Sequence, residues 1–206
     1  MAKKKRAQPE KKKSDKLIYA GLAVLVLAAA GLYFSSISAP AQPDIFQPTE
    51  PGKVKIVEFL KFDCSHCYDL HKEMPQILKK YGDKVEIMYV PIVRQGQSTK
   101  SIEAYIIADQ MGKGEDMQDA LFTAKFVKGM DIMESSLALE TVASGIGLGA
   151  DFKSKLEGND GRKGALSNLA LMNKYGVQAT PTVFINGKQI TPLPTFIDNN
   201  ISSMLG

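Results

Sequence analysis

Cysteine and histidine are scarce in this chain, and their scarcity narrows the chemistry that the chain can perform. Of its 206 residues, only Cys64, Cys67, His66 and His71 are of these two types. A structural zinc site normally has four ligands, and no second cysteine pair exists to complete one. The two cysteines lie three residues apart, a spacing that can close a tight disulfide. We therefore predict thiol-disulfide exchange, with a zinc half-site or two incidental cysteines as the alternatives.

The cysteine pair directly follows an apolar run from Val54 to Phe62. If a helix begins at Cys64, its free N–H groups and its dipole favour a thiolate there, and the thiolate is the form that attacks disulfides. His66 lies between the two cysteines, where the residue type tunes thiol reactivity. His71 is four residues beyond Cys67 and is expected to be an exposed helix residue, with a place in a metal site as the alternative.

Positive charge is also scarce once the first 16 residues are set aside. These residues hold eight of the lysines and arginines and two acidic residues. The rest of the chain has 18 basic and 20 acidic residues, a net charge of −2. The basic character belongs to a tail, so the sequence does not indicate nucleic-acid binding.

No charged residue occurs between Leu17 and Pro43, and residues 17–34 form an uncharged, predominantly apolar run. At about 1.5 Å per residue, this run reaches about 27 Å, close to the hydrocarbon thickness of a bilayer. Because the positive charges precede it, residues 1–16 are predicted to be a cytoplasmic tail and 17–34 a transmembrane helix. The alternative is a cleaved signal peptide ending near Ala39-Pro40-Ala41, although the run exceeds the usual apolar length of roughly 7 to 15 residues.

Residues 35–52 contain four prolines among small and polar residues. This composition is typical of a semi-extended linker. Residues 53–206 are then enough for one domain with a hydrophobic core. A disulfide persists in an oxidising compartment, so we expect a single-pass protein of the cell inner membrane with a periplasmic domain.

The folded part begins with a predicted strand, helix and strand. Residues 53–60 change from alternating to mostly apolar, as in a strand covered on both faces. Apolar residues recur at helical spacing over 65–80, with Pro75 as a kink, and 85–93 is a second apolar run. These segments form a βαβ unit that carries the cysteines at its first strand-to-helix turn.

The middle of the chain, residues 96–176, is predicted to be a helical insertion. Amphipathic patterns mark helices around 102–106, 117–124 and 139–146. Asp131 and Glu134 resemble a capping box, and Asp160 is expected to cap a longer helix that ends near Tyr175.

The end of the chain carries a hairpin signal and a closing helix. Asn186-Gly187 lies between two short apolar segments and readily forms a two-residue turn. Residues 194–204 are predicted to form a helix, with Phe196 and Ile201 among the residues that face inward.

This order of elements resembles the thioredoxin fold, and the helical insertion resembles the DsbA-like family of bacterial thiol oxidoreductases. Glu58, Phe59, Phe62, Cys64, His66 and Cys67 match that family's E-F-x-x-F-x-C-P-H-C pattern. Residues 175–187 are similar to its second signature, in which Pro181 would be cis and face the cysteines. The resemblance implies an α/β, thioredoxin-like fold over residues 53–206 with an inserted helical subdomain, preceded here by the transmembrane helix.

The resemblance also implies roles for particular residues. Cys64 would be the nucleophile and Cys67 the resolving thiol of a redox-active Cys64–Cys67 disulfide. His66 would stabilise the Cys64 thiolate, and Glu58 would be a buried proton acceptor beneath the pair.

Four further residues are implied in substrate binding, namely Thr180, Pro181, Ser65 and Phe62. Thr180 and Pro181 would hold a substrate peptide by backbone pairing. Ser65 replaces the family's usual proline, and Thr180 stands where the strongest oxidases have valine. Threonine at that point is more typical of family members with isomerase or reductase activity.

The resemblance implies an oxidase that donates its disulfide to exported cysteine-containing proteins and is reoxidised by a quinone-linked membrane partner. It implies no cofactor and no metal. A monomer is expected, because the linker is too short to contain a dimerisation domain. The alternatives are a periplasmic reductase or isomerase, and a Cu(I) metallochaperone that uses the two thiolates.

Overall fold

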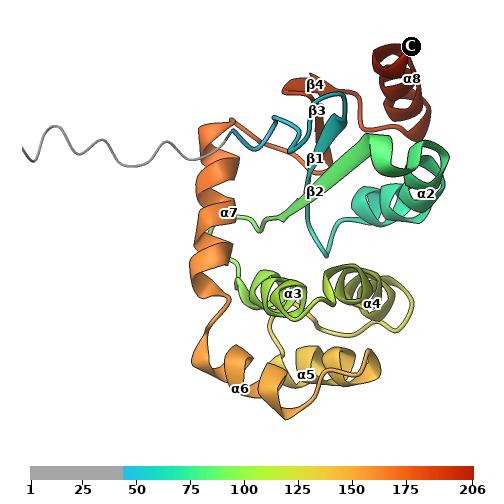
Figure 1. Cartoon of the computed structure of the whole chain (residues 1–206). Coiled ribbons are helices and arrows are strands. Elements are labelled where there is room, and N and C mark those ends of the chain that lie inside the picture. Colours follow the sequence, from blue (N-terminus) through green and yellow to red (C-terminus); the bar gives the residue numbers. More distant parts are fainter. Residues whose placement is uncertain (1–43) are drawn as a thin grey trace, which may run out of the picture. The chain divides into compact units, whose positions relative to one another are not determined.

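A four-stranded mixed sheet frames the folded domain of the computed structural model, which describes residues 44–206 (Figure 1). The strands are β1 (Val54–Leu60), β2 (Val85–Pro91), β3 (Thr182–Ile185) and β4 (Lys188–Ile190). Their order is β2-β1-β3-β4. β1 runs parallel to β2 and antiparallel to β3, so the strand that leads to the cysteines lies inside the sheet.

Seven α-helices and one 3₁₀ turn accompany this sheet in the described part of the chain. The 3₁₀ turn is η1 (Gly82–Lys84). The helices are α2 (Ser65–Tyr81), α3 (Lys100–Gln110), α4 (Gly114–Phe126), α5 (Ser136–Gly145), α6 (Ala150–Gly158), α7 (Arg162–Lys174) and α8 (Pro194–Leu205). The predicted transmembrane helix, 17–34, lies outside the described residues. Within residues 44–206, none of the helices is long and apolar enough to cross a membrane.

The seven α-helices of residues 44–206 are α2 to α8. They divide between the two faces of the sheet and the insertion. α2 and α8 cover one face, where Ile56 of β1 packs with Leu70 and Ile197. α7 covers the other, where Leu169 and Met172 pack against the cluster that contains Phe59.

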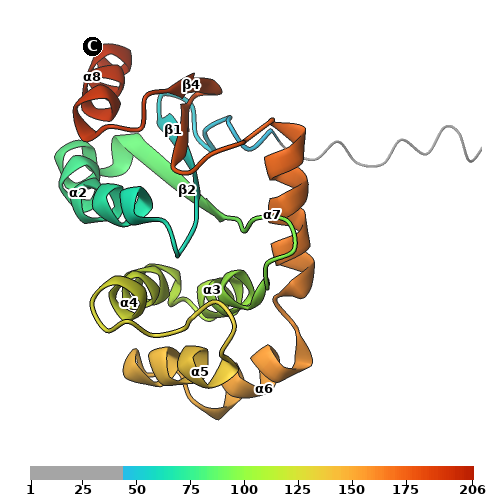
Figure 2. The ribbon, with the colours of Figure 1, turned by 180° about the vertical axis from the view of Figure 1, so that it is seen from behind.

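The helical insertion lies beyond one end of the sheet, between β2 and β3 in the chain. α3, α4, α5 and α6 form it, and α7 leads back from it alongside the sheet (Figures 1 and 2). The turn from β1 to α2 points toward α3 and α4 in both views. Leu60, Phe62 and Cys67 belong to the same buried cluster as the insertion's apolar residues, so one core joins the cysteine motif to the insertion.

The folded unit begins at Asp44 rather than at Lys53, the predicted domain start. Phe46 is buried, and its ring lies 4.6 Å from the ring of Tyr175 and 4.7 Å from that of Phe184. Thr49 donates to the Glu86 carboxylate through its hydroxyl at 2.6 Å. The last part of the predicted linker is therefore packed against the domain.

Several predicted helix starts are corrected by the structure. Asp131 Oδ1 accepts from the backbone N–H groups of Met133 and Glu134, but these residues form a turn. The next helix, α5, begins after Ser135, whose hydroxyl accepts from the Ala138 N–H at 3.2 Å. Asp160 does not cap α7 either, since Gly161 occupies that position and makes no side-chain cap.

The hairpin prediction is confirmed, and the closing helix is confirmed with one exception. Asn186 and Gly187 both have positive φ, at 45° and 82°, between β3 and β4. α8 buries Ile197 and Ile201, whereas Phe196 is 50% exposed instead of facing inward.

Candidate active site

The cysteine pair lies where β1 ends and α2 begins. Cys64 is the N-cap of α2, and its Sγ accepts from the Cys67 N–H at 3.4 Å. A sulfur at this position lies next to free backbone N–H groups and the positive end of the helix dipole, which favours a thiolate. Both cysteines are free thiols, so the structure describes the dithiol form.

The two thiols have different surroundings. Cys64 is half-buried and donates from Sγ to the carbonyl oxygen of Thr180 at 3.3 Å. Cys67 is fully buried. Burial, followed by the hydrogen bond with Cys64, raises the pKa of the Cys67 thiol well above its usual range. Cys64 can therefore reach a partner's sulfur, while Cys67 can reach only Cys64.

The cis Thr180–Pro181 bond lies beside Cys64, as the resemblance predicts. These residues come from the loop before β3, more than a hundred positions beyond the cysteines, and the antiparallel pairing of β1 with β3 carries this loop to the cysteine turn. Thr180 offers its backbone carbonyl to the same region in which a substrate cysteine would attack.

Open space flanks the cysteine turn on two sides. A pocket of about 600 Å³ is lined by Cys64, Ser65, His66 and Thr180, together with the loop that follows β2. A second pocket, of about 520 Å³, is lined by Leu70, Pro181 and Leu193, and also by His66 and Thr180. His66 and Thr180 thus stand between two spaces that a polypeptide could occupy.

Glu58 lies inside the sheet. It is 2% exposed and shares its face of β1 with Ile56 and Leu60, the face that α2 covers. Burial raises the pKa of its carboxyl to about 8. Tyr89, its partner on β2, also has a raised pKa, first because it is buried and then because of the nearby Glu58. A carboxyl that ionises near neutral pH is suited to accept or donate a proton.

Two predictions about individual residues are corrected. Phe62, expected to bind substrate, is 2% exposed, and its ring lies 5.4 Å from that of Phe122 in the core of the insertion. It therefore fixes the turn and does not reach a substrate. His71 is half-buried rather than exposed, with Nε2 3.3 Å from Asp119 Oδ1 on α4.

The cysteines gather no metal-ligand set around them. Within residues 44–206, no three or more histidine, cysteine, aspartate or glutamate side chains are grouped so that they could hold a metal ion. His71, the histidine considered for such a site, contacts Asp119 and Gln118 of α4. Exchange between thiols and disulfides needs only the sulfur atoms.

Two residues that were not predicted from the sequence, Lys61 and Asp63, line the larger pocket together with Cys64. They form an ion pair between a buried lysine and a half-buried aspartate, with Lys61 Nζ 3.0 Å from Asp63 Oδ1. Both occupy unspecified positions of the E-F-x-x-F-x-C pattern, so the pattern gave no signal. The alternation of buried Phe62 with charged neighbours on either side could have drawn attention to them.

Comparison with known proteins agrees with this site. A family described as Thioredoxin matches residues 42–199. The thiol:disulfide interchange protein DsbA of Burkholderia cepacia is 26% identical over 174 residues, covering 79% of this chain and 81% of that protein. The protein of the same name from Pseudomonas syringae is 26% identical over 139 residues, covering 67% of this chain and 64% of that protein.

Solved structures show the same fold. The oxidoreductase DsbA from Xylella fastidiosa has a TM-score of 0.64 at 24% identity, covering 77% of this chain and 89% of that one. MdbA, a thiol-disulfide oxidoreductase from Corynebacterium diphtheriae, has a TM-score of 0.60 at 21% identity, covering 75% and 84%. The chain belongs to the thioredoxin family. With Cys64 and Cys67 at its site, it is a DsbA-like thiol:disulfide oxidoreductase.

Proposed function

We propose that this enzyme acts as an oxidase, donating a Cys64–Cys67 disulfide to cysteine-containing proteins outside the cytoplasm. The observation that carries the proposal is the asymmetry of the two thiols, because Cys64 borders the larger pocket and Cys67 is fully buried. A disulfide at this position exposes one sulfur to attack and protects the other.

The exchange has two steps. A substrate thiolate attacks Cys64 Sγ, the Cys64–Cys67 bond breaks, and Cys67 takes up a proton as it leaves. A second substrate thiolate then attacks the substrate sulfur of the mixed disulfide and releases Cys64 as a thiolate. The substrate loses two electrons and gains a disulfide, while the enzyme gains two electrons and becomes the dithiol.

The burial of Cys67 and the positive end of the α2 dipole at Cys64 both favour transfer of the disulfide from the enzyme to the substrate. The raised pKa of the Cys67 thiol favours its protonated form once it has left. The N-terminus of α2 favours a thiolate at Cys64, and stabilising the reduced enzyme makes its disulfide a stronger oxidant.

The smaller pocket supplies a place for the substrate chain. Its apolar lining comes from Leu70, Pro181 and Leu193, and the last is 49% exposed. We place an extended substrate segment there, paired with the backbone before Pro181 as an added strand.

Mixed-disulfide trapping tests the proposal. In a Cys67→Ser variant, a substrate that attaches to Cys64 cannot be released by the second cysteine. This variant should accumulate adducts with exported proteins, and a matched Cys64→Ser variant should accumulate few. Equal adducts in both variants would contradict the assigned roles.

A membrane anchor at 17–34, a cytoplasmic tail at 1–16 and a periplasmic domain are part of the proposal. The one-sided charge around the apolar run supports them. Protease added to intact spheroplasts should then digest the domain, and a protected domain would contradict this topology. The proposed partners are exported proteins and a quinone-linked membrane protein, and the proposed state is a monomer.

A reductase is the second candidate, and Thr180 before the cis proline is the observation that favours it. It would use the same two sulfurs with the electrons flowing in the opposite direction. The direction is set by the redox potential of the cysteine pair relative to its partners.

A further inference from the structure

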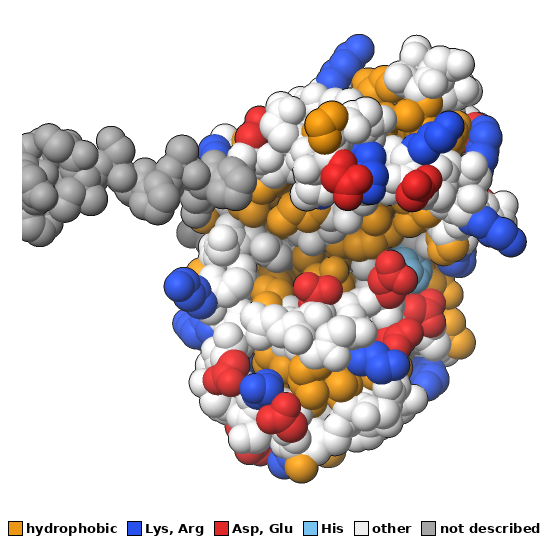
Figure 3. Space-filling view, viewed as in Figure 1, with side chains coloured by type: hydrophobic (Ala, Val, Ile, Leu, Met, Phe, Trp, Pro, Cys, Tyr) orange, Lys and Arg blue, Asp and Glu red, His pale blue; other side chains and the backbone are white. Residues whose placement is uncertain are grey.

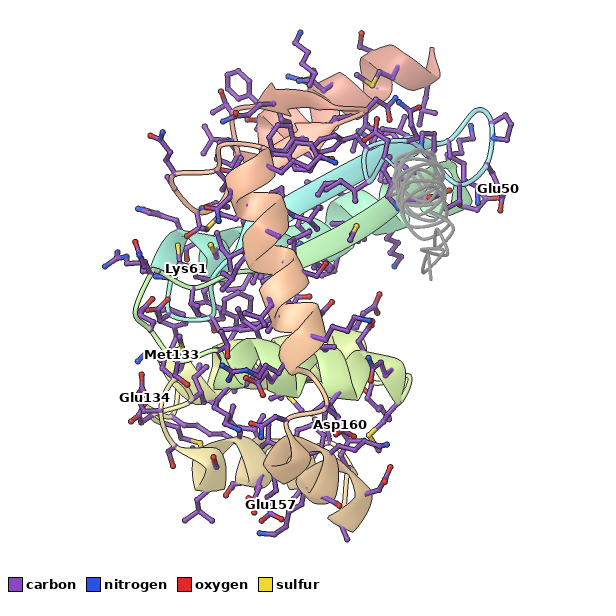
Figure 4. All side chains as sticks on the ribbon, turned by 90° about the vertical axis from the view of Figure 1, so that its left-hand side faces the viewer. Glu50, Lys61, Met133, Glu134, Glu157 and Asp160 are labelled. Carbon is purple, nitrogen blue, oxygen red and sulfur yellow. The ribbon has the colours of Figure 1, made fainter. Side chains whose placement is uncertain are left out.

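The turn that leads into the cysteine motif carries a pair of opposite charges, a buried lysine and a half-buried aspartate. Lys61 is 7% exposed, although lysine is almost never fully buried without a partner. Its Nζ lies 3.0 Å from Oδ1 of Asp63, the residue immediately before Cys64. Figure 4 labels Lys61 at this turn.

The turn is held in place on both sides. The Cys64 N–H donates to the Lys61 carbonyl oxygen at 3.2 Å, which ties the nucleophile to the residue that carries the positive charge. Phe62, between the two charged residues, is packed against Phe122 and Tyr105. With Phe62 buried in the insertion, the side chains of Lys61 and Asp63 both line the pocket that Cys64 borders.

The carboxylate of Asp63 depends on this lysine. Asp63 Oδ1 is inaccessible to solvent and makes no hydrogen bond within residues 44–206. The ammonium at 3.0 Å supplies the compensating charge. Without it, a buried negative charge would lie one residue before a cysteine that must carry negative charge itself.

We propose that Lys61 neutralises the charge of Asp63 beside Cys64 and thereby keeps the redox potential of the Cys64–Cys67 couple from falling. The Lys61 side chain is a positioning group that acts on Cys64 through its charge. Its ammonium offsets Asp63 and so preserves the thiolate-favouring field of the α2 N-terminus at Cys64. This inference rests on the oxidoreductase activity and does not depend on whether the enzyme works as an oxidase or a reductase.

The relevant equilibrium is the reduction of the disulfide by glutathione. Two glutathione thiols give up two electrons and two protons and become one glutathione disulfide. The Cys64–Cys67 disulfide takes them up and becomes two thiols, of which Cys64 is the one that reacts as a thiolate. A positive charge near Cys64 stabilises the reduced enzyme and raises the potential, whereas a negative charge lowers it.

The test is the glutathione redox equilibrium of three variants at pH 7. Asp63→Asn leaves Lys61 uncompensated, so the equilibrium constant for reduction should rise about tenfold, or ~30 mV. Lys61→Met leaves Asp63 uncompensated, so the constant should fall by a similar factor. The double variant should return close to the wild-type value.

Two controls separate charge from structural damage. Lys61→Arg keeps the positive charge and should keep the wild-type potential, which covers the case in which Lys61→Met does not fold. Asp116→Asn removes one carboxylate from an exposed ion pair with Lys113 on α4 and should leave the potential unchanged.

Opposite shifts in the two single variants would support the proposal. Shifts of the same sign, or unchanged potentials in both folded variants, would overturn it. Failure of Cys67→Ser to trap substrates would instead contradict the proposed oxidase. It would not change what the redox potentials of the Lys61 and Asp63 variants show.

Discussion

Replacing Glu58 with glutamine should stabilise the domain in a strongly pH-dependent way. Glutamine has nearly the shape of glutamate and cannot ionise. Burial raises the pKa of the Glu58 carboxyl from 4.5 to about 8. Between these two values the unfolded chain releases this proton while the folded chain keeps it, so the wild-type free energy of unfolding decreases as the pH rises.

The size of the effect follows from the two pKa values. Each pH unit in this window costs the wild type about 1.4 kcal/mol. Near pH 5 the unfolded chain still keeps part of this proton, so the integrated change from pH 5 to pH 7 is about 2 to 3 kcal/mol. Above the folded pKa, both states are ionised and the difference becomes constant.

Urea unfolding of the reduced wild type and Glu58→Gln at pH 5, 6 and 7 measures this difference. Subtracting the two curves removes the contribution of the other titrating groups. Glu58→Leu is a matched control, because it also removes the carboxyl and should give the same pH slope even if its packing changes the absolute stability. A difference between wild type and Glu58→Gln that stays constant over this range would refute the reasoning.

Two further predictions concern stability. Phe46→Ala should lower the free energy of unfolding by about 3 kcal/mol or more in urea, since Phe46 is buried between Tyr175 and Phe184; a loss below 1 kcal/mol would show that residues 44–50 are not part of the core. Gly161→Ala should also destabilise the domain, because an added Cβ would lie 2.5 Å from the Glu103 carbonyl oxygen. Gly145→Ala, with no neighbour within 4 Å, is the control, and an equal loss in both variants would contradict this explanation.

Much of the fold could be predicted because its signals are local. The apolar run of β1, the helical spacing of α2 and the Asn186-Gly187 turn each indicate a secondary structure within a short stretch of sequence. The place of the cysteines at the start of α2 follows from the order of these segments.

The features that the sequence did not predict either depend on contacts between residues far apart in the chain or begin without a side-chain N-cap. α6 has only Phe152 and Leu156 as buried residues and begins after Gly149, which offers no side-chain cap. The prolines of residues 35–52 predicted a linker, but Phe46 packs against rings more than a hundred residues away.

The candidate site was predictable only as far as its motifs specify residues. The family pattern names Cys64 and Cys67 and leaves the residue before Cys64 open. Whether Phe62 faces the core or the substrate depends on how the insertion closes over it, and this the pattern does not specify. The Lys61–Asp63 ion pair depends on the conformation of the turn, which the sequence pattern does not specify.

The redox state of Cys64 and Cys67 inside living cells tests the proposed oxidase most directly. Cells would be quenched with acid, free thiols labelled with a mass tag, and the protein separated by size. An oxidase that awaits its substrates rests with the cysteines joined, so we expect an untagged protein that gains two tags only after reduction. A protein that carries both tags without prior reduction would rest as the dithiol, and this result would contradict the oxidase and identify a reductase.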